Sequence, residues 1–279
     1  MTPILQAIIL GIVEGITEFL PISSTGHLIV AESLIGFKDI AETFTVVIQV
    51  GAILAVIWFY RHDLVKRVAG LASSTTQQRF WINLVIASVP AAVLGLVFVN
   101  KIDTVLKTNN VVAGSLIVGG IIIWLVETAR KNVPSASSES EAVARIDGIT
   151  PMQALYIGLG QVAALVPGVS RSGASIISGM LAGLDRATAT AFSFYLGLPI
   201  LILASIYKLY KGRHVLRLLP GGTPALAVGT LVSGIVAFAA VAWLLGYITH
   251  HDFKGFAIYR VVAGLVIIAL VATQVIPAS

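Results

Sequence analysis

The stretch that decides the fold lies near the start of the chain and reads PILQAIILGIVEGITEFLPISSTGH over residues 3–27. Its first part, Pro3–Leu20, is largely apolar and long enough to enter a bilayer. The stretch then breaks at Pro-Ile-Ser-Ser-Thr-Gly, and a second, short apolar run follows. A helix broken at membrane depth is tolerated only where its backbone is buried in protein or lines a wet cavity. We therefore interpret this stretch as a re-entrant helix hairpin.

A second stretch, PMQALYIGLGQVAALVPGVSRSGAS at residues 151–175, has the same organisation. When the first stretch is shifted by 147 residues, it aligns with the second without a gap. The aligned pairs are Gln6 with Gln153, Ala7 with Ala154, Gly11 with Gly158, Glu14 with Gln161, Ser23 with Ser170, Thr25 with Ser172, and Gly26 with Gly173. Pro151–Val166 and the run after it are therefore expected to form a second hairpin. The alternative is that both stretches are further spanning helices, with their polar turns outside the membrane.

The composition of the whole chain excludes a soluble protein. Of 279 residues, 57% are hydrophobic and only 11% are charged, whereas a soluble domain carries about 25% charged residues. The mean hydropathy is +0.95. The net charge of +5 is divided among short loops, so no nucleic-acid partner is expected. Because the chain has no cysteine, disulfides and thiolate metal sites are excluded.

Six further apolar segments are long enough to span a bilayer. They are Phe44–Tyr60, Ile82–Val99, Val111–Glu127, Ala187–Tyr207, Ala225–Tyr247 and Ala257–Val275. Three follow each hairpin, and because three is odd the second half must lie upside down relative to the first. The expected fold is an all-α polytopic membrane protein with an inverted-topology repeat, about six spanning helices and two re-entrant helix hairpins. The repeats are residues 1–131 and 151–279, joined by a solvent-exposed linker at 132–150. Basic residues divide too evenly between the two faces to fix the orientation.

Two acids interrupt the first apolar segment. Glu14 and Glu18 are four residues apart and share one helical face. Carboxylates this close in an apolar helix are expected to face a cavity, with a shared proton or a cation between them. A divalent cation such as Mg²⁺ or Ca²⁺ prefers oxygen ligands of this kind. The alternative is a polar face turned towards water. Because Gln161 and Leu165 stand at these positions in the second copy, the helix does not need the acids to fold.

The two breaks carry the remaining candidate residues. Ser23, Ser24, Thr25, Gly26 and His27 form the first break, where hydroxyls and backbone N–H groups can hold an anion and a serine or the imidazole can act as a nucleophile. The alternative for the serines is capping of the next helix.

The second break holds Ser170, Arg171, Ser172 and Gly173. A guanidinium suits phosphate oxygens; the alternative for Arg171 is an ion pair with Glu14 or Glu18, and both can hold in turn. Together the breaks favour an anionic headgroup whose tail stays in lipid, with phosphoryl transfer as the reaction. A transporter or flippase of lipid phosphates is the alternative function, since inverted repeats with broken helices are a transporter architecture.

In these motifs the chain resembles the undecaprenyl-diphosphate phosphatases, also called bacitracin-resistance proteins. The resemblance rests on EGITEFLPISSTGH at residues 14–27 and PGVSRSGAS at 167–175, with support from FSF at 192–194 and FAIYR at 256–260. It extends over nearly the whole chain. One departure is Ser175, where the second motif commonly ends in threonine, although the hydroxyl is retained.

The resemblance implies removal of the terminal phosphate from undecaprenyl diphosphate, a polyprenyl diphosphate lipid, to give the monophosphate carrier for peptidoglycan synthesis. It also implies a divalent cation, a site open to the outer, periplasmic face of the bacterial inner membrane, and bacitracin resistance. In this chain Glu14 and Glu18 would handle metal or protons, Ser24 or His27 would be the nucleophile, and Arg171 would hold the diphosphate. Ser23, Thr25, Ser170 and Ser172 would complete a phosphate cradle. The oligomeric state stays open, with a homodimer as the alternative to a monomer.

Overall fold

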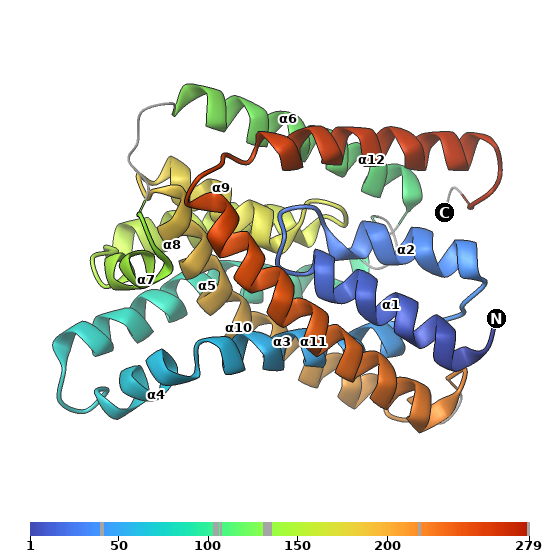
Figure 1. Ribbon diagram of the computed structural model, residues 1–279, viewed down its shortest axis with the longest axis horizontal. Helices are drawn as coiled ribbons and strands as arrows, with labels where there is room; N and C mark the ends of the chain where they lie inside the picture. The colour runs from blue at the N-terminus through green and yellow to red at the C-terminus, as the bar shows by residue number, and fades with distance from the viewer. Residues whose placement is uncertain (40–41, 103–105, 107, 131–135, 217–218, 278–279) are drawn as a thin grey trace.

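The computed structural model describes residues 1–39, 42–102, 106, 108–130, 136–216 and 219–277, and within those ranges it contains helices and no strands (Figure 1). The helices are α1 (Pro3–Thr17), α2 (Ser24–Ile35), α3 (Thr43–Phe59), α4 (Arg61–Ala69), α5 (Thr75–Lys101), α6 (Asn109–Ala129), α7 (Glu139–Ile146), α8 (Pro151–Gln161), the 3₁₀ turn η3 (Val162–Leu165), α9 (Arg171–Leu181), α10 (Arg186–Gly212), α11 (Gly222–Ile248) and α12 (Lys254–Ala272).

Five described helices are long and apolar enough to cross a membrane. They are α6, α10, α11, α12 and, within α5, Thr75–Phe98. Large apolar side chains on these helices, such as Leu203, Leu231 and Leu265, point away from the protein and are more than half exposed, as lipid-facing residues are. The prediction of an all-α, multi-pass membrane protein is confirmed.

The first predicted span, Phe44–Tyr60, differs from a simple crossing. It forms α3, which has 17 residues, and the chain then bends by 70° into α4. Together α3 and α4 make a sixth span if the bent pair is counted as one. The bend coincides with the charged run that begins at Arg61, which ends the apolar segment.

Both predicted breaks are present, and they have the same backbone conformation. α1 and α2 are separated by residues 18–23, and α8 and α9 by η3 and residues 166–170. Each second helix starts after a serine in a strained conformation, with φ of 72° at Ser23 and 75° at Ser170. Non-glycine residues seldom adopt positive φ. In Figure 1 the loop between α1 and α2 lies near the middle of the molecule.

The helices of the two halves pack in exchanged pairs. α1 packs against α11, α8 packs against α5, and α6 packs against α12. The first two pairs use glycines at matching positions. A Cβ on Gly11 would lie 2.6 Å from the carbonyl oxygen of Gly229, and one on Gly158 would lie 2.5 Å from that of Ala87. Close backbone approach at small residues is how helices associate in lipid, where burial of apolar surface gives no driving force.

The described part of the predicted linker at 132–150 contains a helix that the sequence analysis did not predict. This helix, α7, packs against α10 with Ala142 and Ile146 buried, while residues 137–140, 144 and 145 are exposed.

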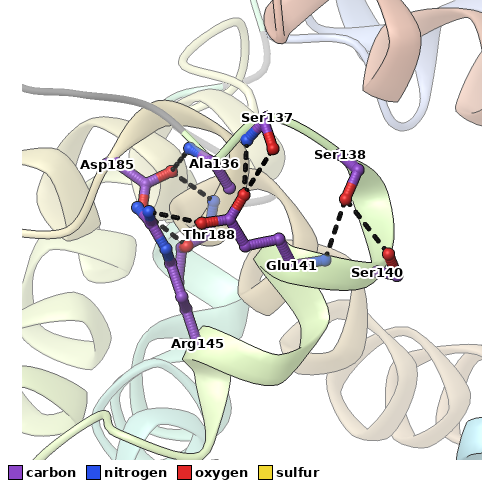
Figure 2. A network of polar contacts seen from close by, with 8 residues as sticks. All are labelled: Ala136, Ser137, Ser138, Ser140, Glu141, Arg145, Asp185 and Thr188. Atoms are coloured by element: carbon purple, nitrogen blue, oxygen red, sulfur yellow. Dashed lines mark hydrogen bonds and ion pairs between the residues drawn. The ribbon is translucent and has the colours of Figure 1, made fainter.

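Figure 2 shows the polar contacts that fix this segment: Glu141 accepts hydrogen bonds from Ser137 and from Arg145 Nη2 at 2.6 Å, and Arg145 Nη1 reaches Asp185 Oδ2 at 3.0 Å. Asp185 caps α10 by accepting from the Thr188 N–H. The linker is therefore attached to the start of α10.

Candidate active site

Glu18 lies between the two breaks and contacts both of them. Its Oε2 accepts a hydrogen bond from Ser24 Oγ at 2.7 Å, and its Oε1 lies 3.2 Å from Arg171 Nη2. The Glu18 side chain is only 4% exposed. A hydroxyl bonded to a carboxylate that is itself oriented by a third group is the arrangement of an activated nucleophile. The ion pair expected as the alternative for Arg171 is therefore present.

The guanidinium of Arg171 is held in place but keeps a free donor. Its Nη1 donates to the carbonyl oxygen of Ser193 at 3.1 Å. Gly197 makes room for it, since a Cβ there would collide with the same nitrogen. Among the described residues the buried Nε has no hydrogen-bond partner. The Nε–H of Arg171 is therefore a buried donor that no described residue uses.

Glu14 is the least satisfied group of the site. Its side chain is fully buried, and neither carboxylate oxygen has a hydrogen-bond partner within the described part of the chain. Glu18 and Arg171 are the charges that act on it. A buried carboxylate without a partner must be neutralised by a proton or a cation. Glu14 and Glu18 therefore fit a divalent cation chemically, although no cluster of three or more His, Cys, Asp or Glu side chains occurs among the described residues.

The hydroxyls of the second break join the two hairpins. Ser172 Oγ donates to the carbonyl oxygen of Leu20 at 2.8 Å, and Ser170 Oγ lies 3.0 Å from Ser172 Oγ. Ser170 also caps α9 by accepting from the Gly173 N–H at 3.1 Å. Ser175 Oγ, the departure from the family pattern, lies 2.6 Å from Ser193 Oγ. In this structure these serines make contacts within the protein, and the cap at Ser170 is a role that the sequence analysis did not assign to it.

The remaining candidate residues of the first break are Ser23, Thr25 and Gly26. Ser23 is buried at the cap position of α2, but its side chain makes no capping hydrogen bond. Thr25 is exposed, and Gly26 lets α2 approach Val112 of α6, where a Cβ would be 3.1 Å from a methyl carbon. Of the predicted hydroxyls in this break, Ser24 is the one that contacts an acid.

His27 is held at both ring nitrogens. Nδ1 lies 2.7 Å from the carbonyl oxygen of Ser23, and Nε2 lies 2.6 Å from the hydroxyl of Tyr259, whose ring stacks on the imidazole at 5.5 Å. Because a carbonyl oxygen only accepts, Nδ1 carries the proton, and in the neutral ring Nε2 accepts from Tyr259. Both ring nitrogens of His27 therefore have hydrogen-bond partners. The Ser24 hydroxyl, in contrast, contacts Glu18, a carboxylate that can act as its base.

Sequence reasoning did not identify Tyr259 and Arg260 as parts of this site. Arg260 is fully buried and donates to carbonyl oxygens of both breaks, those of Pro21 and Gly168. A signal was available, because Arg260 is the one charged residue in the apolar segment Ala257–Val275, and a charge inside a membrane span is functional by default.

Comparison with known proteins shows the family of the chain. The family described as bacitracin resistance protein BacA matches residues 7–266. The chain is 49% identical over 266 residues to undecaprenyl-diphosphatase 1 of Burkholderia cenocepacia, which covers 95% of this chain and 94% of that protein. It is 46% identical over 276 residues to undecaprenyl-diphosphatase of Deinococcus radiodurans, covering 98% and 97%. The motifs that form the two breaks lie inside the matched range. The protein belongs to the BacA family of bacitracin resistance proteins.

Proposed function

We propose that the protein is an integral membrane phosphatase of the bacterial inner membrane that hydrolyses undecaprenyl diphosphate to undecaprenyl phosphate and inorganic phosphate. This reaction recycles the lipid carrier for peptidoglycan synthesis and confers bacitracin resistance. Family membership and the names of the relatives support the substrate. The observation that carries the chemistry is the position of Glu18, bonded to Ser24 on one side and to Arg171 on the other.

Ser24 is the nucleophile in this proposal. Its Oγ attacks the terminal phosphorus while its proton passes to Glu18 Oε2, and the bond from that phosphorus to the bridging oxygen breaks. Undecaprenyl phosphate leaves with the bonding electron pair, and Glu18 loses its proton to water. In the second step Glu18 takes a proton from an attacking water and returns it to Ser24 Oγ as the phosphoserine bond breaks.

Arg171 and a bound divalent cation would neutralise the negative charge of the diphosphate. The free Nε–H and the Nη groups of Arg171 can bind equatorial oxygens of the transferred phosphoryl group, where charge is spread in the transition state. Glu14 and Glu18 would hold a divalent cation, Mg²⁺ or Ca²⁺, which supplies further neutralisation of the diphosphate when it is bound. Such ions are commonly held by one or two carboxylates together with substrate phosphates.

The proposed architecture is an inverted repeat of residues 1–131 and 151–279, with two re-entrant hairpins and an active site that opens to the periplasmic face. Three observations support the repeat: the 147-residue match, the positive φ at Ser23 and Ser170, and the exchanged packing of α1 on α11 and α8 on α5. An exchange of equivalent partners is what a two-fold relation between two halves produces.

The test is phosphate release from undecaprenyl diphosphate by the purified protein in detergent. It is measured with and without Mg²⁺ or Ca²⁺, beside Glu14→Gln and Arg171→Ala. Metal-dependent release by the wild type, lost in both folded variants, is the expected result. No release by folded wild-type protein, under conditions that support a known phosphatase, would instead favour a flippase of polyprenyl phosphate lipids. That outcome would be checked by following undecaprenyl phosphate between leaflets of proteoliposomes.

A further inference from the structure

Arg260 occupies an unusual place for a charged residue. It lies on α12, its side chain is 0% exposed, and its guanidinium donates to four backbone carbonyl oxygens. These belong to Pro21 at 3.0 Å, Gly168 at 3.0 Å, Ser115 at 3.1 Å and Leu116 at 3.3 Å. One side chain therefore joins α12, α6 and both breaks.

The two break carbonyls that Arg260 binds are equivalent in the internal repeat. Pro21 and Gly168 are separated by the same 147 positions that relate Ser23 to Ser170. Pro21 lies two residues before the positive-φ serine Ser23 and three before the start of α2. Gly168 lies at the same distances from Ser170 and from the start of α9. These helices start with Ser24 and Arg171, the two groups that meet at Glu18.

The guanidinium of Arg260 forms no ion pair with an acid in the described part of the chain. Among the residues that the structure describes, no carboxylate lies within ion-pair distance of its guanidinium, although its charge acts on His27. Burying an unpaired cation is unfavourable, and four carbonyl dipoles offset this only in part. α6 is shaped to accept the group, since a Cβ on Gly119 would collide with Nη2.

We infer that Arg260 is a positioning residue for the phosphatase reaction. By holding the carbonyls of Pro21 and Gly168 at one point, it sets the spacing between the two breaks, and so between Ser24 and Arg171. Its unpaired charge also favours an anionic headgroup over a neutral one. This inference rests on the proposed function for its kinetic consequences, but the spacing of the breaks can be measured without turnover.

Three variants separate geometry from charge. Gly119→Ala keeps Arg260 but displaces its guanidinium, whereas Arg260→Lys keeps the charge and loses the planar fork. Arg260→Met loses both. The matched control is Gly114→Ala on the same helix, because a Cβ there meets no atom within 4 Å.

Phosphate release is measured over a range of substrate concentrations to separate kcat from KM. Gly119→Ala and Arg260→Lys are expected to lower kcat about 100-fold with KM within about three-fold, since small misplacements have effects of this size. Arg260→Met is expected to raise KM as well, and Gly114→Ala to match the wild type. Wild-type kcat in folded Gly119→Ala and Arg260→Lys would overturn the inference.

A second measurement does not need activity, so it separates this inference from the proposed function. The chain has no cysteine, so spin labels can be attached to Thr25→Cys and Ala163→Cys, exposed positions beside the two breaks. The distance distribution between the labels is expected to shift or broaden in Gly119→Ala and to stay unchanged in Gly114→Ala. Identical distributions in the two variants would overturn the positioning role, even if the wild type proved inactive on undecaprenyl diphosphate.

Discussion

Arg171→Lys tests the proposed role of the guanidinium most directly. Arg171 now spans two partners, the carbonyl oxygen of Ser193 at 3.1 Å and Glu18 Oε1 at 3.2 Å, and it keeps Nε–H free. A lysine ammonium can keep the ion pair with Glu18, but it cannot reach Ser193 and still present a fork to a phosphoryl group. Loss of one preorganised donor lowers kcat by about 10²–10³, or about 2.7–4 kcal/mol. We expect a loss of that size.

The assay is phosphate release from undecaprenyl diphosphate, with thermal unfolding measured on the same preparations. Because lysine keeps the charge beside Glu18, the melting temperature should stay within a few degrees of that of the wild type. Arg79→Lys makes the same chemical change at an exposed position of α5 and should leave turnover unchanged. If folded Arg171→Lys turns over within three-fold of the wild type, the guanidinium does not bind the transferred phosphate.

Three other substitutions test the metal, a buried ion pair and the linker. Glu18→Gln should weaken the dependence of residual phosphate release on Mg²⁺ or Ca²⁺; an unchanged metal titration would place the cation elsewhere. Glu127 is buried; its two carboxylate oxygens share the Nε–H of Arg186, and one of them also accepts from Nη2. Glu127→Gln should therefore reduce the free energy of unfolding, measured by denaturant titration, by about 3 kcal/mol. Burial raises the pKa of Asp185, but hydrogen bonds led by the one from the Thr188 hydroxyl hold that pKa below its ordinary value of 3.8. The stability that Asp185 contributes is therefore present above pH 4 and lost as the pH falls through its folded-state pKa. Asp185→Asn should remove that part of the acid sensitivity of the melting temperature, and an unchanged pH profile would contradict it.

The sequence predicted the elements of the fold better than their lengths and bends. Apolar runs and their Pro, Ser and Gly boundaries identified the spans and both breaks, because those signals are local. α7 was missed because its apolar face consists of little more than Ala142 and Ile146, in a segment otherwise rich in serine and charge. That helix depends on packing against α10, which a local pattern does not contain.

The candidate site was also predictable only in part from the sequence. Glu14, Glu18 and Arg171 were identified from sequence because a charge in an apolar segment is conspicuous. The contact between Ser24 and Glu18 was not predictable, since it depends on the positive φ of Ser23, which a serine seldom adopts. Arg260 is conspicuous as a charge, but its role depends on carbonyl oxygens from three distant segments.

The charges of the site support the proposal that a divalent cation and a diphosphate bind there together. Glu18 and Arg171 form an ion pair, whereas neither the carboxylate oxygens of Glu14 nor the Nε–H of Arg171 have a hydrogen-bond partner among the described residues. A divalent cation would neutralise Glu14, and phosphate oxygens would accept from the Nε–H of Arg171. A diphosphate that arrives with a divalent cation provides both signs at once. Gln161 occupies the position of Glu14 in the second hairpin, buried and also without a hydrogen-bond partner, but it is neutral. An unsatisfied polar group thus stands at this position in both copies of the repeated stretch, and it is an acid only in the first copy, which also carries Glu18 and Ser24.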